Sequence, residues 1–236
     1  MVILALDTSS AAGSAAVLRD GVVVAERAGD ASRTHGERLP RELMAVLEDA
    51  RADLHDVTTF AVCTGPGSFT GLRVGIATMQ GLAFAQRKLV VPVSAFEALA
   101  RTRTTEPSAV ATWIDAHRGE VFACLFDADG RVLREPTSLP PAATLDLWLN
   151  NGLATDAAIR FEGDGAGKYA AIIGERIAHA TIASQVPLLA GTIARIADAA
   201  RERAVTPHAV VPLYVRRPDA ELARDRKAST TTQGKP

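Results

Sequence analysis

The apolar positions of this chain come in short runs that polar turns separate. Three such runs lie within residues 2–28, and Asp20-Gly21 between the second and the third is typical of a hairpin turn. Apolar residues then recur at helical spacing, which predicts a helix over residues 36–53. A buried strand over residues 60–64 and an apolar helix over residues 70–88 follow. This alternation of strands and helices predicts an α/β fold.

The second half of the chain repeats the order of features in the first half. In each half an apolar strand ends in an aspartate, a glycine follows, and a second apolar strand leads to an Asp-Gly turn. The matching positions are Asp7 and Asp115, Gly13 and Gly119, and the pairs Asp20-Gly21 and Asp129-Gly130. One such hairpin is common, but two in one chain, each at the start of a half, predict a duplicated α/β domain.

A polar stretch that contains a proline, residues 102–108, marks the predicted domain boundary. We expect a first domain over residues 1–104 and a second over residues 105–217. A helix over residues 188–203 would pack back on the first domain. From residue 218 to 236 the chain is polar and lacks apolar periodicity, which is typical of a disordered tail.

A glycine-rich segment, GPGSFTGLRVG at residues 65–75, joins a predicted strand to a predicted helix. Its turn leaves backbone N–H groups at the positive end of a helix dipole, which suits an anion such as phosphate, and it also lets another backbone come close. The segment lacks the Gly-Lys-Ser/Thr of a Walker loop, and Ser68 is not centred in a nucleophile elbow. A later glycine run, residues 163–167, lacks the full phosphate-loop pattern and predicts a turn before a helix.

The helix that follows the glycine-rich segment carries no charge between Arg73 and Arg87. A helix that is apolar all round is covered on more than one side. It also contains Gly71, Gly75 and Gly81, and each glycine costs about 1 kcal/mol relative to alanine inside a helix. Two explanations stay open: crowded packing within the chain, or close contact between the helices of two subunits.

Composition narrows the function classes. The formal net charge is -1 and aromatic residues make up 5% of the chain, so neither the charge balance nor a basic–aromatic stripe marks a nucleic-acid-binding protein. Hydrophobic residues make up 47%, but no apolar run reaches the roughly 18 residues of a membrane span. The chain starts without a basic leader, and we expect Cys63 and Cys124 to be buried reduced thiols, so we expect a cytoplasmic protein.

The best catalytic candidates by spacing are Asp7 and Asp115, at the ends of matching strands. In a duplicated fold they would face each other across a cleft and could hold Mg²⁺ bound to nucleotide phosphates, and Ser9 adds a hydroxyl nearby. A strand-end aspartate is equally well explained as a turn former, so both interpretations stay open. The five histidines include no pair at positions i and i+4, so we predict no metal site.

Four segments together resemble the bacterial TsaB (YeaZ) family. They are residues 3–9, Arg33-Thr34-His35, residues 65–83 and Tyr214-Val215-Arg216, and the likeness spans roughly residues 1–217. The resemblance implies two related domains of the actin-like, sugar-kinase and Hsp70 (ASKHA) class. It also implies a role in making N6-threonylcarbamoyladenosine (t6A) in tRNA, at the adenosine just 3′ of the anticodon in ANN-decoding tRNAs.

The resemblance further implies a non-catalytic subunit that binds and activates the transferase TsaD together with the ATPase TsaE. The catalytic paralogue carries a histidine pair in its first helix, whereas this chain has only His35, with Leu39 in the second place. Any ATP or ADP and Mg²⁺ would then be bound at the level of the complex. The chain would contact tRNA through the complex, and it could form a homodimer when isolated. The alternative is an independent ATPase or phosphotransferase that uses Asp7 and Asp115 in the interdomain cleft.

The family's subunit interface lies on the first two helices of the N-terminal domain, here residues 36–53 and 70–88. The interface residues expected on these helices are Leu43, Leu47, Gly71, Val74, Gly75, Thr78 and Leu82. The second helix is the one that carries no charge between Arg73 and Arg87, so the residue pattern and the resemblance indicate the same surface.

Overall fold

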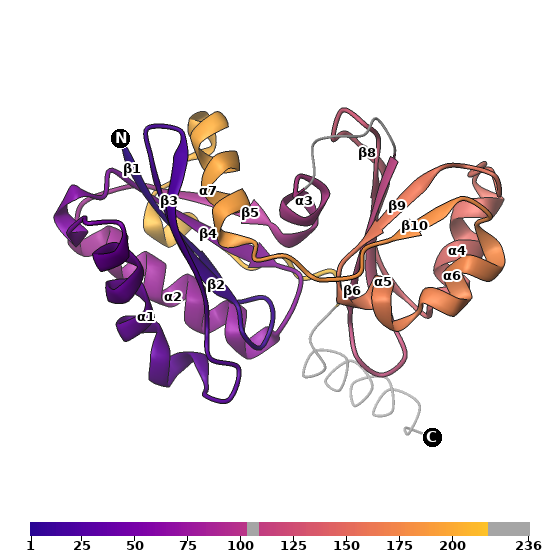
Figure 1. Ribbon diagram of the computed structural model, residues 1–236, viewed down its shortest axis with the longest axis horizontal. Coiled ribbons are helices and arrows are strands. Elements are labelled where there is room, and N and C mark those ends of the chain that lie inside the picture. The colour runs from indigo at the N-terminus through magenta and orange to yellow at the C-terminus, as the bar shows by residue number, and fades with distance from the viewer. Residues whose placement is uncertain (103–108, 217–236) are drawn as a thin grey trace, which may run out of the picture.

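The computed structural model describes residues 1–102 and 109–216, which form two halves that each contain a five-stranded sheet (Figure 1). The strands of the first sheet are β1 (Val2–Asp7), β2 (Ser14–Arg19), β3 (Val22–Ala28), β4 (Thr59–Gly65) and β5 (Val90–Ser94). Their order is β3-β2-β1-β4-β5, with β1, β4 and β5 parallel to one another and the β1-β2-β3 hairpins antiparallel.

The second sheet has the same topology as the first. Its strands are β6 (Ala109–Asp115), β7 (Val121–Phe126), β8 (Val132–Leu139), β9 (Ile159–Glu162) and β10 (Ala180–Ile182). The order β10-β9-β6-β7-β8 is that of the first sheet when β6 takes the place of β1. The predicted duplication of an α/β unit is therefore confirmed.

Both helices predicted in the first half, over residues 36–53 and 70–88, are observed, and both differ in extent from the prediction. The α-helices are α1 (His35–Asp49), α2 (Phe69–Ala85), α3 (Ala95–Ala100), α4 (Pro141–Asn150), α5 (Asp164–Lys168), α6 (Ala170–Arg176) and α7 (Ala190–Ala199), and the 3-10 helices are η1 (Leu54–Asp56), η2 (Arg201–Arg203) and η3 (Pro207–Ala209). The first predicted helix is too long, because α1 ends at Asp49 and Leu54 opens η1.

The glycine run at residues 163–167 was expected to be a turn, and that prediction is wrong. Helix α5 begins at Asp164, so most of the run is helical. Gly165 lies against the end of β6, where a Cβ atom would come within 3.0 Å of the Trp113 backbone oxygen. The glycines therefore allow a helix to start close to a strand, which local turn propensity does not reveal.

Helices cover both faces of the first sheet. One face packs against α1 and α2, and the other packs against α3 and α7 (Figure 1). Helix α7 follows the second sheet in the chain but packs on the first. Its N-terminal amides are bound by that sheet: Ser14 Oγ accepts from the N–H groups of Leu189 and Ala190, at 3.2 and 3.0 Å, and Glu26 Oε1 accepts from Gly191 at 2.7 Å.

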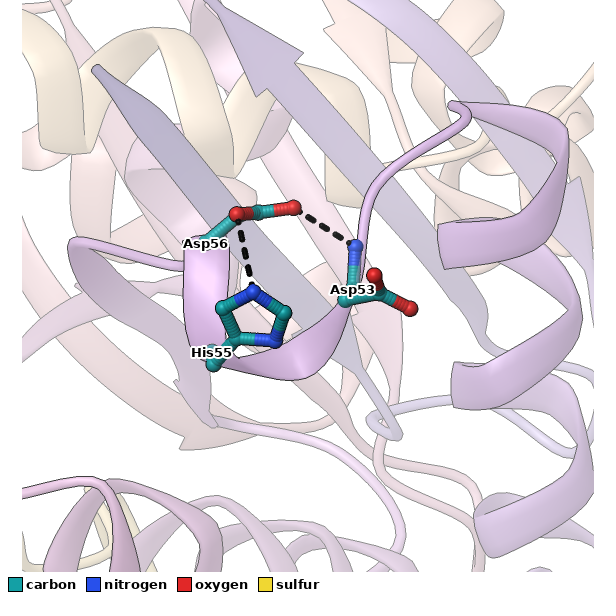
Figure 2. Close-up of side chains that lie close together, drawn as sticks. All are labelled: Asp53, His55 and Asp56. Carbon is teal, nitrogen blue, oxygen red and sulfur yellow. Dashed lines mark hydrogen bonds and ion pairs between the residues drawn. The ribbon is translucent and has the colours of Figure 1, made fainter.

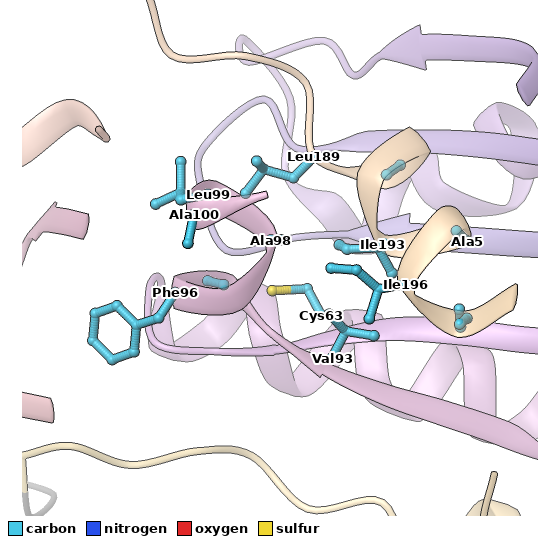
Figure 3. Close-up of a cluster of buried hydrophobic side chains, with 14 of the residues drawn as sticks. Ala5, Cys63, Val93, Phe96, Ala98, Leu99, Ala100, Leu189, Ile193 and Ile196 are labelled. Carbon is cyan, nitrogen blue, oxygen red and sulfur yellow. The ribbon is translucent and has the colours of Figure 1, made fainter. Parts of the chain in front are cut away.

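An apolar cluster joins the two halves through α3. Figure 3 shows α3 next to α7, with Phe96 and Leu99 on the side of α3 that faces away from Ile193 and Ile196 of α7. The same cluster continues into the second sheet, where the members are Val110, Ile114, Phe122, Cys124 and Phe126. Both cysteines are buried and neither forms a disulfide, in line with the expected reduced thiols.

Two of the predictions fall on residues outside the described ones. Residues 103–108, where the domain boundary was placed, and residues 217–236, which hold the predicted tail, are not described. The domain ranges therefore stay a prediction. In the part of the chain that the structure describes, none of the helices combines the length and the apolar character needed to cross a bilayer.

Candidate functional site

The glycine-rich segment between β4 and α2 packs tightly against the loop that follows β1. The Ser68 N–H donates to Ser9 O at 2.7 Å, and a Cβ atom on Gly67 would lie 2.3 Å from that oxygen. Ser68 is also the N-cap of α2, because its Oγ accepts from the Gly71 N–H at 3.2 Å. Of the two uses that the sequence left open for this segment, close backbone approach is the one observed at Gly67.

Two glycines of α2 face the interior of their own chain. A Cβ atom on Gly71 would lie 2.4 Å from Thr8 O, and one on Gly75 would lie 2.1 Å from Thr8 Oγ1. A Cβ atom on Gly81 would meet nothing within 4 Å among the described residues beyond the adjoining backbone of its own helix. The first two glycines therefore serve crowded internal packing, which was the alternative to a subunit contact.

This packing corrects part of the predicted interface. Leu43 and Leu47 are 2% and 1% exposed in the core beneath α1, and Gly71 and Gly75 are buried as well. A residue inside the core of its own chain cannot present a side chain to a partner. Val74, Thr78 and Leu82 are half-buried at the border of the exposed face of α2, so this part of the set stays a prediction.

The exposed face of α2 carries different residues from those expected. Phe84 is 79% exposed, and Met44 on the neighbouring helix α1 is 54% exposed. The other exposed, uncharged positions of α2 beyond Arg73 are Ala77, Gly81 and Ala85. They recur at intervals of three and four residues, opposite the buried Ile76 and Met79, so helical periodicity could have separated the two faces. We call Ala77, Gly81, Phe84 and Ala85 of α2 the outer face.

The two strand-end aspartates make the same local bond in the two halves. Asp7 Oδ1 accepts from the Ser9 N–H at 2.9 Å, and Asp115 Oδ1 accepts from the His117 N–H at 3.1 Å. Both therefore act as turn formers of the kind expected after a strand. Asp7 is buried, whereas Asp115 also forms an ion pair with Lys168 at 2.7 Å. Burial opposes the ionisation of Asp115, but the Lys168 ammonium and the His117 N–H outweigh it and lower the pKa of the carboxyl.

A pocket of about 460 Å³ lies between the two halves of the molecule. Residues 66–70 and Leu72 line it from the first half, Asp115, Ala116, His117 and Phe122 line it from the second half, and Leu213, Tyr214, Val215 and Arg216 complete the wall. Its size is within the range of small-molecule sites. The described lining includes Asp115 but neither Asp7 nor Ser9, so the magnesium site built on both aspartates stays a prediction.

Sequence reasoning missed most of these pocket residues. Phe69, His117 and Phe122 come from separate segments with no shared spacing, so only the tertiary fold brings them together. The Tyr214-Val215-Arg216 segment was noted for its family likeness alone. Its position near the end of the chain, after the last helix, was the one signal that could have indicated a site.

The single histidine at the start of α1 lies in a partly buried polar region. Burial lowers the pKa of His35, and the nearby Arg38 guanidinium adds to the effect. Among the described residues, neither His35 Nε2 nor Thr8 Oγ1 has a hydrogen-bond partner, although both atoms are buried. Leu39, one turn further along α1, is 1% exposed in the core, and its aliphatic side chain offers no metal ligand beside His35.

Only one group of three potential metal ligands occurs among the described residues. It consists of Asp53, His55 and Asp56, all exposed, around η1 (Figure 2). An Asp56 carboxylate oxygen accepts from the Asp53 N–H at 2.9 Å, and the other lies 3.4 Å from His55 Nε2. These contacts cap a short 3-10 helix, which accounts for the cluster without a metal.

Two sheets of one topology, covered by helices and separated by a pocket, define the ASKHA class of two-domain α/β proteins, and solved structures of that class share this fold. Within this class, the chain belongs to the TsaB (YeaZ) family. The family model described as "TsaD: tRNA N6-adenosine threonylcarbamoyltransferase" matches residues 23–228.

Individual relatives support this membership. The solved structure of YeaZ from Pseudomonas aeruginosa is 32% identical, with a TM-score of 0.74, and the match covers 90% of this chain and 99% of that one. The tRNA threonylcarbamoyladenosine biosynthesis protein TsaB of Escherichia coli is 35% identical over 131 residues, 55% of this chain and 56% of that protein. An uncharacterised protein of Mycobacterium leprae is 30% identical over 93% of this chain, which spans 56% of the length of that relative.

Proposed function

We propose that this chain takes part in t6A biosynthesis as a non-catalytic subunit that binds and activates a TsaD homologue together with a TsaE homologue. Membership of the TsaB family supports the first part of this proposal, because relatives carry the name tRNA threonylcarbamoyladenosine biosynthesis protein. The observation that carries the second part is the outer face, where Phe84 is 79% exposed in the part of α2 that carries no charge after Arg73. A group of exposed apolar side chains marks a protein interaction surface, and aromatic residues are enriched at such interfaces.

The outer face gives the sharpest test. Phe84→Glu places a charge where a partner would have to bury it, and a hot-spot aromatic contributes about 2 kcal/mol or more to binding, a factor of roughly 30 in Kd. We expect the variant to fold normally, because the side chain is exposed, and to lose co-purification with a TsaD homologue. Calorimetric titration would measure the affinity, and t6A formation on tRNA, with TsaD, TsaE and ATP present, would measure the function.

Val22→Glu is the matched control for this test. Val22 is also an exposed apolar residue, 63% exposed, but it lies on the edge strand β3. We expect its affinity for TsaD and its support of t6A formation to equal those of the unmodified chain. Equal affinity of Phe84→Glu and Val22→Glu would contradict the assignment of the interface to the outer face.

An independent nucleotide-dependent enzyme is the second candidate, because Asp115 and His117 line the interdomain pocket. In that case Asp115 would act with Mg²⁺ on a bound nucleotide. The purified chain alone would then hydrolyse ATP, and Asp115→Asn would abolish turnover. We favour the accessory subunit, for which ATP or ADP and Mg²⁺ act at the level of the complex, so we expect no turnover by the chain alone.

A further inference from the structure

The segment Leu213–Arg216 connects the two halves of the molecule along the wall of the interdomain pocket. At its start, the Leu213 N–H donates to Thr64 O, at the end of β4, at 2.8 Å. At its end, Arg216 forms an ion pair with Glu120 at 3.2 Å. Ser138 Oγ donates to the same carboxylate oxygen at 2.8 Å and so holds Glu120 in place on the second sheet. The two ends of this four-residue segment are therefore fixed to different sheets.

The middle of the segment holds the first turns of α2. The ring centroid of Tyr214 lies 5.8 Å from that of Phe69, and the Tyr214 hydroxyl accepts from Arg73 Nε at 3.1 Å. The Arg73 guanidinium carbon in turn lies 3.8 Å from the centre of the Phe69 ring. Each of the three side chains contacts the other two, so the start of α2 is tied to the C-terminal segment by directed interactions.

The apolar junction at α3 joins the halves in a different way. Burial of Phe96 and Leu99 keeps the halves together, but the hydrophobic effect has no preferred direction and sets no angle between the sheets. The ion pair of Arg216 and the hydrogen bond of Tyr214 do have defined directions.

We infer that Tyr214 and Arg216 are positioning residues that clasp the two domains across the pocket and fix the N-terminal turns of α2 relative to the second domain. The bearing of this clasp on partner binding rests on the proposed function, since it assumes that α2 is the docking helix. The clasp itself is a property of the free chain. Opening of the clasp changes the separation of the domains without unfolding either one.

The separation of the domains can be measured between spin labels in the free chain. Glu48→Cys on α1 and Glu175→Cys on α6 provide exposed thiols, whereas Cys63 and Cys124 are 0% and 1% exposed and stay unlabelled. The Arg216–Glu120 pair is partly open to solvent, and an ion pair at a protein surface shifts an equilibrium by a factor of about 1.4 to 5. We therefore expect Arg216→Ala to raise the population of wider separations two- to fivefold, and Tyr214→Phe, which loses only the hydroxyl, to act in the same direction.

A charge swap separates positioning from general weakening of the fold. Arg216→Glu faces Glu120 with a like charge and should open the domains further, while Arg216→Glu combined with Glu120→Arg should restore the narrow distribution. Arg176→Ala, which removes an ion pair with Asp146 within the second domain, should leave the distribution unchanged. An identical distance distribution for the unmodified chain and for both Arg216 variants would overturn the proposal.

Affinity for a TsaD homologue is the second readout. The Arg216 variants should weaken Kd two- to fivefold with an unchanged unfolding temperature, and the charge swap should recover it. If the unmodified chain does not bind TsaD at all while the variants still open the domains, the proposed function fails and the clasp stands.

Discussion

At the scale of single residues, the contacts of the α2 glycines predict opposite effects for the same substitution. Gly71→Ala gains helix propensity but drives a Cβ atom to 2.4 Å from a backbone oxygen of Thr8, and overpacking of this kind costs about 1–3 kcal/mol. Gly81→Ala meets no atom and should raise the free energy of unfolding by up to about 1 kcal/mol. Urea unfolding of the two variants measures both changes in the free energy of unfolding. Equal stability of Gly71→Ala and Gly81→Ala would show that α2 does not approach Thr8 this closely.

The residue scale is also where the sequence predicted least of the site. Spacing located Asp7 and Asp115 at matching strand ends, and both make the same turn contact. Which of the two reaches the pocket depends on how the halves are arranged in space, and no local pattern contains that information. The same limit explains the buried Leu43, because helical spacing identifies an apolar face without showing whether the chain itself covers it.

At the scale of elements, most strands and helices follow from the sequence, because alternating apolar runs and Asp-Gly turns define both hairpins. Strand β10 was missed, since three residues are too few to show a period. Helix α7 docks on the first sheet through apolar contacts and through hydrogen bonds from its first amides to Ser14 and Glu26, which no local pattern reveals.

That capping gives a prediction for α7. Ser14 is 4% exposed and its hydroxyl is the acceptor for two amides at the start of the helix, so Ser14→Ala leaves both without this acceptor. We expect a loss of about 1–2 kcal/mol in the free energy of unfolding. The substitution should accelerate amide hydrogen exchange in α7 more than in the other elements. Ser32→Ala, at an exposed serine, is the control and should change stability by less than about 0.5 kcal/mol. Unchanged exchange in α7 for Ser14→Ala would contradict the capping role.

At the scale of the whole molecule, the apolar cluster around α3 predicts that the two halves unfold together. The chain has two tryptophans, and both lie in the core of the second sheet, so their fluorescence reports on that half alone, whereas far-UV circular dichroism reports on the entire chain. Phe96 is 1% exposed, and Phe96→Ala should cost about 3–5 kcal/mol. We expect both signals to shift to lower denaturant by the same amount, while Phe84→Ala, at an exposed phenylalanine, shifts neither. If Phe96→Ala shifted the dichroism transition but not the tryptophan transition, the halves would be independent folding units. The clasp alone would then have to fix the arrangement of the two halves, without help from α3.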